Sequence, residues 1–164
     1  MSFSIFLADA DFDDDKVIAQ IPIPHRYWRL HVISSGNGFD LSANELELRE
    51  SVGGADVTGS PATYACDHIH SSSTIAAAFD NDTSTGYNAP GDGVFPINID
   101  VDFTTGHEKD IHEISWLSRP DAPIRAPVDM DILWSDDGTT WNLSWSERGI
   151  SGWSSGVAKI FTKP

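Results

Sequence analysis

Short oxygen-bearing side chains gather at near-alternate positions in residues 76–87. Asp80 and Asp82 supply carboxylates, and Thr85 adds a hydroxyl. A hard cation such as Ca²⁺ takes about six to eight oxygen ligands, and a curled loop can supply both carboxylates and backbone carbonyls. The segment is not an EF-hand, because the Gly and the terminal Glu are missing from their required offsets. The alternative is a solvated turn in which Asp and Thr side chains cap their own backbone.

A second cluster combines one thiol with two imidazoles, at Cys66, His68 and His70. This spacing could supply three zinc ligands, but no fourth ligand is evident nearby. A loop with a small buried Cys and solvent-facing His explains the same residues and is the favoured interpretation. No nucleophile with a base, and no pair of carboxylates, stands out from the abundant Asp and Glu. We therefore expect a binding protein and not an enzyme.

The charge of the chain excludes two classes of partner. Its 164 residues include 10 Lys and Arg against 25 Asp and Glu, a net charge of −15 with neutral His. This balance repels nucleic-acid phosphates and anionic lipids alike. No apolar run approaches the roughly 18–20 residues of a membrane helix, and the N-terminus lacks a basic region and a cleavage signal. We expect one soluble domain with no nucleic-acid partner and no membrane insertion.

The elements that must position these residues are short strands separated by turns. Asp137-Gly138 supplies the positive φ of a tight hairpin, and the three prolines of residues 118–127 predict a loop. No window holds an apolar stripe at helical spacing for three turns. Many short strands predict a sandwich or barrel closed mostly by antiparallel pairing. The predicted strands are 27–33, 45–49, 97–103, 111–117, 128–134, 141–146 and 157–162.

Residues 78–87, AFDNDTSTGY, resemble the A-x-D-G-D-x-x-T-x-W calcium loop of the discoidin family, which includes the coagulation-factor C-type and carbohydrate-binding sandwiches. Asn81 stands where the family has Gly, and Tyr87 where it has Trp. Three more segments resemble the family in its usual order, at residues 99–103, 111–116 and 128–141. The resemblance implies an all-β, galactose-binding-like sandwich of the antiparallel jelly-roll type.

The order of two other segments departs from the family. Residues 26–30 resemble its closing R-Y-V-R-I strand and residues 41–49 its L-x-x-x-E-x-E segment, yet both come first here. The chain thus resembles a circular permutant, which can form the same core contacts where the termini lie close together. We expect residues 25–164 to form the sandwich. Residues 1–24, with an acidic run, would form an arm that docks onto an assembly or is disordered.

The resemblance also implies a structural calcium ion. In the family a glutamate of the E-x-E strand closes the site, which places the Glu45 carboxylate at the distant loop. Two carboxylates with several neutral oxygens suit Ca²⁺. The implied shell is the side chains of Asp80, Thr85 and Glu45 with the carbonyls of Ala77, Asp82 and Asn44.

The proline-rich loop resembles a sugar-binding stretch. Residues 119–125 are similar to, though one residue shorter than, the R-x-D-x-x-x-x-R/K stretch of the fucose-binding lectin branch. The upstream histidine of that branch is replaced by Val94, which speaks against fucose itself. Guanidinium groups can span vicinal hydroxyls, and aromatic faces cover the apolar side of a sugar ring. Ion pairing of the arginines and core filling by Trp153 remain alternatives. The candidate ligand-binding residues are Arg119, Asp121, Arg125, His68, His70, Tyr87 and Trp153.

Together these features predict a non-catalytic, lectin-like module that binds a glycan or polysaccharide. Permuted modules of this kind resemble domains of phage tail or capsid proteins that contact bacterial surface polysaccharide, an analogy at the level of the fold. We expect a location in a virion or an extracellular surface assembly without a signal peptide, and otherwise in the cytoplasm. The competing function is a structural decoration protein that uses the sandwich for contacts with other virion or assembly proteins.

Overall fold

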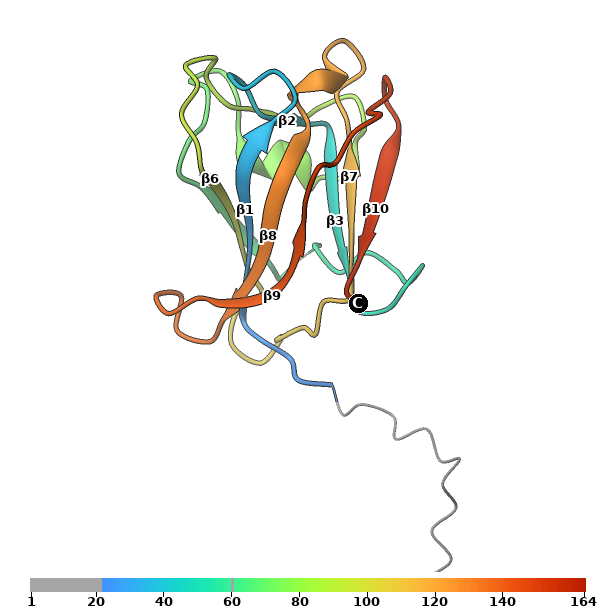
Figure 1. Cartoon of the computed structure of the whole chain (residues 1–164). Coiled ribbons are helices and arrows are strands. Elements are labelled where there is room, and N and C mark those ends of the chain that lie inside the picture. Colours follow the sequence, from blue (N-terminus) through green and yellow to red (C-terminus); the bar gives the residue numbers. More distant parts are fainter. Residues whose placement is uncertain (1–21, 60) are drawn as a thin grey trace, which may run out of the picture.

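The computed structural model describes residues 22–59 and 61–164 (Figure 1). Two short 3-10 helices, η1 (Ile75–Ala78) and η2 (Pro123–Arg125), lie in the connections. All of the paired strands run antiparallel. The strands are β1 (Tyr27–Ser35), β2 (Ser42–Ala43), β3 (Glu45–Arg49), β4 (Thr63–Cys66), β5 (Tyr87–Asn88), β6 (Ile97–Asp102), β7 (Glu113–Leu117), β8 (Pro127–Ser135), β9 (Asn142–Glu147) and β10 (Ala158–Thr162).

The strands form two main sheets and one small one. The five-stranded sheet has the order β4-β6-β1-β8-β9, and the three-stranded sheet has the order β10-β7-β3. Figure 1 shows these two sheets as separate layers. The remaining pair, β2 and β5, joins residues far apart in the chain. The prediction of an all-β fold with antiparallel sheets is confirmed.

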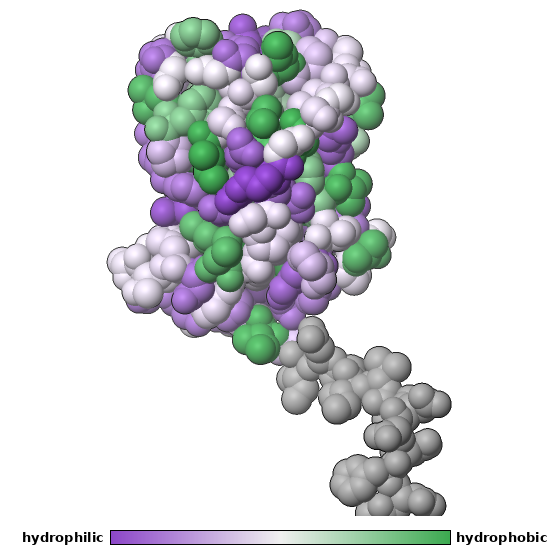
Figure 2. Space-filling view, in the orientation of Figure 1, coloured by the Kyte–Doolittle hydropathy of each residue, from purple (hydrophilic) through white to green (hydrophobic). Residues whose placement is uncertain are grey.

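The core fills the space between the two main sheets because residues alternate along the strands. On β1 the buried residues Trp28, Leu30 and Val32 alternate with more exposed neighbours. Strands β3 and β7 direct apolar side chains, such as those of Leu46 and Trp116, toward the same core. On the face of the molecule in Figure 2, exposed hydrophobic residues form separate patches among polar ones.

The predicted strands are all present, with bounds within two residues of those expected. The turn between β8 and β9 has the expected positive φ at Gly138, 71°. Ser135 and Asp137 accept hydrogen bonds from backbone amides of this turn. Strands β2, β4 and β5 were not predicted, because two of them have only two residues and β4 lacks a buried apolar face.

The prediction of an arm over residues 1–24 falls mainly on residues 1–21, which lie outside the described part. Pro22–Pro24 precede the sheets, and the Ile23 amide donates to the Asp110 carboxylate at 3.1 Å. The first paired residue in the described ranges is His25, which forms a bridge with Lys109. No helix within these ranges is long and apolar enough to cross a membrane.

Candidate functional site

The pairing of β2 with β5 brings the segment before β3 against the loop of residues 80–85, called here the acidic loop. Ala43 lies opposite Tyr87 in the register. The Asn44 side chain donates from Nδ2 to the Thr83 carbonyl at 2.9 Å, which fastens the loop to the strand. Residues 44–45 and 80–85 therefore meet at one place, although more than thirty residues separate them in the chain.

Oxygen atoms crowd around the Thr85 hydroxyl. Thr85 Oγ1 lies 3.1 Å from the Ala77 carbonyl and 3.0 Å from the Asp82 carbonyl. The two carboxylate oxygens of Asp80 lie 3.0 and 2.8 Å away. A hydroxyl can donate only one hydrogen bond, so it cannot satisfy all of these acceptors. Converging oxygens in excess of hydrogen-bond donors are the arrangement that a hard cation stabilises.

The same loop also caps its own backbone, as the alternative interpretation expects. The Asp82 amide donates to Asp80 Oδ1 at 2.9 Å, and Asp82 accepts bonds from the amide and hydroxyl of Ser84. These Ser84 bonds lower the pKa of Asp82. Asn81 has a φ of 60°. Asn tolerates this left-handed conformation better than most residues with a side chain, which explains how it can stand where the discoidin pattern has Gly.

The Glu45 carboxylate is the most unusual group at the site. Its residue is 5% exposed, and neither carboxylate oxygen makes a well-formed hydrogen bond to any residue in the described part of the chain. Burial raises the pKa of Glu45 to about 7; the Asn81 backbone amide opposes this rise, whereas the nearby charge of Asp80 adds to it. A buried carboxylate without partners is costly, and a bound cation would offset that cost.

The donor set fits a hard cation better than a transition metal. Within residues 22–59 and 61–164, no group of three or more His, Cys, Asp and Glu side chains is placed to hold a metal ion. The Thr85 hydroxyl instead meets oxygens of two backbone carbonyls and of Asp80. Glu45, which makes no well-formed hydrogen bond within the described residues, lies close enough to Asp80 for their charges to interact. Carboxylates combined with neutral oxygens are the ligands that Ca²⁺ prefers.

A cavity of about 380 Å³ adjoins this loop. Arg119 is fixed on its wall, because Nη1 donates to Asn88 Oδ1 and Nε donates to Asp121 Oδ1, both at 2.5 Å. The Arg119 guanidinium lowers the pKa of Asp121. Carboxylate, amide and guanidinium groups thus line one concave surface. The lining residues are Asn44, Thr83, Ser84, Thr85, Gly86, Asn88, Arg119, Pro120 and Asp121.

Three other candidates for ligand binding lie elsewhere. Arg125 pairs with Asp40 at 3.0 Å and does not line the cavity. The indole of Trp153 donates to the Pro127 carbonyl at 2.9 Å and lines a separate, mostly apolar cavity. Tyr87 is fully buried, and its hydroxyl donates to a backbone carbonyl, so its ring packs in the core.

The two histidines and the cysteine do not converge on one point. His68 Nε2 lies 2.9 Å from Asp92 Oδ1, whereas His70 Nδ1 lies 2.8 Å from the Ser72 hydroxyl. Cys66 is directed at the Tyr87 hydroxyl and the His68 carbonyl, and burial raises the pKa of its thiol. Cys66 is half-buried and is the last residue of β4, whereas His68 and His70 follow in the connection after that strand.

Some residues of the cavity were missed by the sequence analysis. Asn88 contributes the amide that orients Arg119, and Thr83 and Ser84 form part of the wall. The only sequence signal for Asn88 is its position next to the acidic loop, because the two-residue pairing of β2 with β5 leaves no periodic pattern.

No protein-family model, curated protein or solved structure matches this chain.

Proposed function

We propose that this chain is a non-catalytic carbohydrate-binding module with a discoidin-like, circularly permuted sandwich. It binds a glycan in the cavity beside the acidic loop, called here the loop-end cavity, next to a structural Ca²⁺. The observation that carries the proposal is the position of the Arg119 guanidinium, held by Asn88 and Asp121 on the wall of a polar cavity. A guanidinium fixed in this way presents its remaining N–H groups at low entropic cost to neighbouring sugar hydroxyls.

The proposed Ca²⁺ is held by the side chains of Glu45, Asp80 and Thr85 together with the carbonyls of Ala77, Asp82 and Asn44. When bound, it supplies positive charge to the two carboxylates and holds the loop against β3. Thr85 belongs both to this shell and to the lining of the cavity, and the residues on either side of it, Ser84 and Gly86, also line the cavity. A rigid loop keeps the wall in shape, so glycan binding is expected to depend on the ion through the position of Thr83–Gly86.

A glycan array tests the function directly. The wild-type chain is expected to bind a restricted set of glycans, and Arg119→Ala is expected to abolish this binding. Arg148→Ala is the matched control, because Arg148 pairs with Asp131 on the outer face of the five-stranded sheet. Arg125→Ala, which removes a guanidinium paired with Asp40, is expected to retain binding. Absence of all glycan binding, with ordered self-assembly or capture by a virion lattice, would favour the decoration protein instead.

The ion is tested separately from the glycan. Mass spectrometry under non-denaturing conditions is expected to find one Ca²⁺ per chain, lost on treatment with chelator. Because a ligand that binds only the folded state raises stability, Tm is expected to rise with added Ca²⁺. A chain that carries no metal and melts at the same temperature in Ca²⁺ and in chelator would overturn the calcium assignment.

A further inference from the structure

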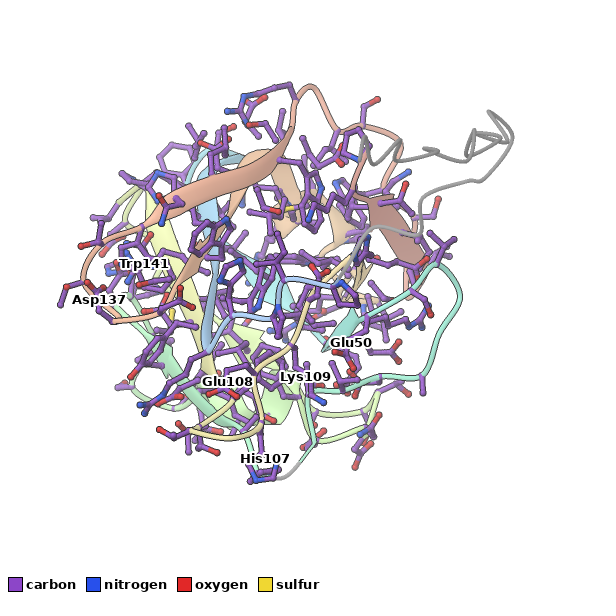
Figure 3. The ribbon with its side chains drawn as sticks, turned by 90° about the horizontal axis from the view of Figure 1, so that it is seen from below. Glu50, His107, Glu108, Lys109, Asp137 and Trp141 are labelled. Atoms are coloured by element: carbon purple, nitrogen blue, oxygen red, sulfur yellow. The ribbon has the colours of Figure 1, made fainter. Side chains whose placement is uncertain are left out.

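A second polar cavity lies on the outer face of the five-stranded sheet. Its volume is about 250 Å³, and it shares no lining residue with the loop-end cavity. Strands β1, β4 and β6 form its floor, and the turn between β8 and β9 forms its wall through Gly138 and Trp141. Figure 3 shows Trp141 near Asp137 on this turn, apart from the labelled residues Glu50 and His107.

Strand alternation places the polar residues of this cavity. On β1 the side chains of Tyr27 and Arg29 alternate with the buried Trp28 and Leu30, and so face outward. The register sets Asp102 opposite Tyr27 and Asp100 opposite Arg29. The strands thus present carboxylates, a guanidinium and the Tyr27 ring side by side on a rigid floor, and the β8–β9 turn adds Trp141.

Each of two arginines is held between a carboxylate and an aromatic ring. Arg29 donates from Nε and Nη2 to the Asp100 carboxylate at 2.6 and 2.7 Å, and its guanidinium carbon lies 3.9 Å from the centre of the Trp141 ring. Arg26 donates to Asp102 at 2.8 and 2.9 Å and lies over Tyr27. Bidentate hydrogen bonds and stacking on the rings hold these side chains in place in the absence of ligand.

The charges of this cavity restrict the ligand. Each Asp is neutralised by an Arg, so the described residues of this cavity leave no unpaired cation to attract an anion to a chain with a net charge of −15. The Arg29 guanidinium covers one face of the Trp141 ring and that of Arg26 lies over the Tyr27 ring, which disfavours a cationic ligand. Trp141 still lines the cavity, where a neutral ring can pack against it. The carboxylate oxygens and the Thr63 hydroxyl can still bond to neutral hydroxyl groups.

We propose that this cavity is a second saccharide site, which binds one neutral sugar ring against Trp141 with Asp100, Asp102 and Thr63 as hydrogen-bond partners. The module is then bivalent, with one site at the loop end and one on the sheet. Two sites on one rigid body increase the apparent affinity for a polysaccharide that can reach both. This site stands independently of the loop-end proposal, because the two cavities have no residue in common.

The test is a titration of ¹⁵N-labelled protein with methyl glycosides of glucose, galactose, mannose and N-acetylglucosamine. At least one of them is expected to shift the amides of Thr63, Ala65 and Gly138 and the Trp141 indole. Trp141→Ala is expected to weaken this binding about tenfold or more, as truncation of an aromatic anchor does. Leu143→Ala is the control, since Leu143 is an exposed β9 residue outside the cavity lining, and it is expected to bind as the wild type does.

A second variant keeps the test informative if Trp141→Ala alters the fold. Ala65 is exposed and lies opposite Asp100, so Ala65→Arg is expected to fill the cavity without removing an existing contact. It should abolish the sheet-site shifts while leaving those of Thr83–Gly86 unchanged. Shifts confined to Thr83–Gly86 and Arg119, or no shifts with any of the glycosides, would overturn the sheet site. Shifts confined to the sheet would support it and would count against the loop-end glycan proposal.

Discussion

Glu45 combines a buried carboxylate with the absence of any well-formed hydrogen bond to the described residues. Its replacement by Gln keeps the shape and removes the charge. In chelator, Glu45→Gln is expected to be as stable as the wild type or more so, because a buried charge without a partner is costly. Added Ca²⁺ is expected to raise the Tm of the wild type and not that of the variant. An equal Ca²⁺-induced shift in both proteins would contradict a role for Glu45 in binding the ion.

The pH dependence of the metal-free protein tests the same group. The ordinary pKa of Glu is 4.5, and burial raises it to about 7 in the folded chain. Between these values the folded protein holds a proton that the unfolded chain has released. The contribution of Glu45 to stability therefore falls as pH rises from about 4.5 to about 7, and it is level above that range. Urea unfolding in chelator is expected to show this fall in the wild type relative to Glu45→Gln; parallel profiles would contradict it.

At the scale of elements, the turn between β8 and β9 depends on Gly138. Its φ is 71°, and an added Cβ would lie 3.3 Å from the Tyr27 ring. Gly138→Ala is expected to cost about 1 kcal/mol or more of unfolding free energy, because Ala resists positive φ. Gly59→Ala is the control, since its Cβ would meet open space at ordinary φ, and it should be nearly neutral. Chemical denaturation measures both, and equal losses would remove the special role of Gly138.

The junction of β2 with the acidic loop depends on a different glycine. A Cβ on Gly86 would lie 2.5 Å from the Ala43 carbonyl and 2.9 Å from Asn44 Cα, both backbone atoms. Gly86→Ala must therefore push the loop away from β2. We expect Ca²⁺ to bind this variant more weakly than the wild type, as measured by isothermal titration calorimetry. Gly59→Ala again serves as the control, and unchanged Ca²⁺ affinity in Gly86→Ala would show that this contact does not shape the site.

At the scale of the whole molecule, the net charge of −15 opposes compaction through self-repulsion. Salt screens such repulsion, with a Debye length of about 10 Å at 0.1 M. In chelator, the Tm is expected to rise when NaCl is increased from about 10 mM to about 0.3 M. Ca²⁺ at low millimolar concentration should add a further rise that MgCl₂ at the same concentration does not match. A Tm that falls with NaCl would contradict the repulsion argument.

Periodicity is what made most of the fold predictable. The alternation on β1 and β6 marks which residues enter the core, because each side chain packs against the opposite sheet. The β2–β5 pair carries no such signal, since two residues cannot show a period. Yet this pair fixes the place where Glu45 and the acidic loop meet. That meeting was expected only through the resemblance to the discoidin family.

The candidate sites divide in the same way. The residue types of the acidic loop indicated an oxygen-rich site, because the oxygen atoms of Asp and Thr side chains are known from the sequence alone. The sequence did not indicate which residues line the loop-end cavity. Arg119 and Asp121 line it, whereas Arg125, in the same proline-rich loop, pairs with Asp40. Loops follow no period, so the direction of each side chain depends on contacts with distant segments.

The sequence by itself determined that the chain forms short antiparallel strands, carries a strong negative charge and has one loop rich in oxygen ligands. These properties follow from local propensity, side-chain alternation and composition, which act over a few residues at a time. The tertiary structure alone decided that Glu45 is buried with no well-formed hydrogen bond to the described residues, that Asn88 orients Arg119, and that Trp141 covers Arg29. Each of these facts depends on segments far apart in the chain, which come together only when the sheets pack.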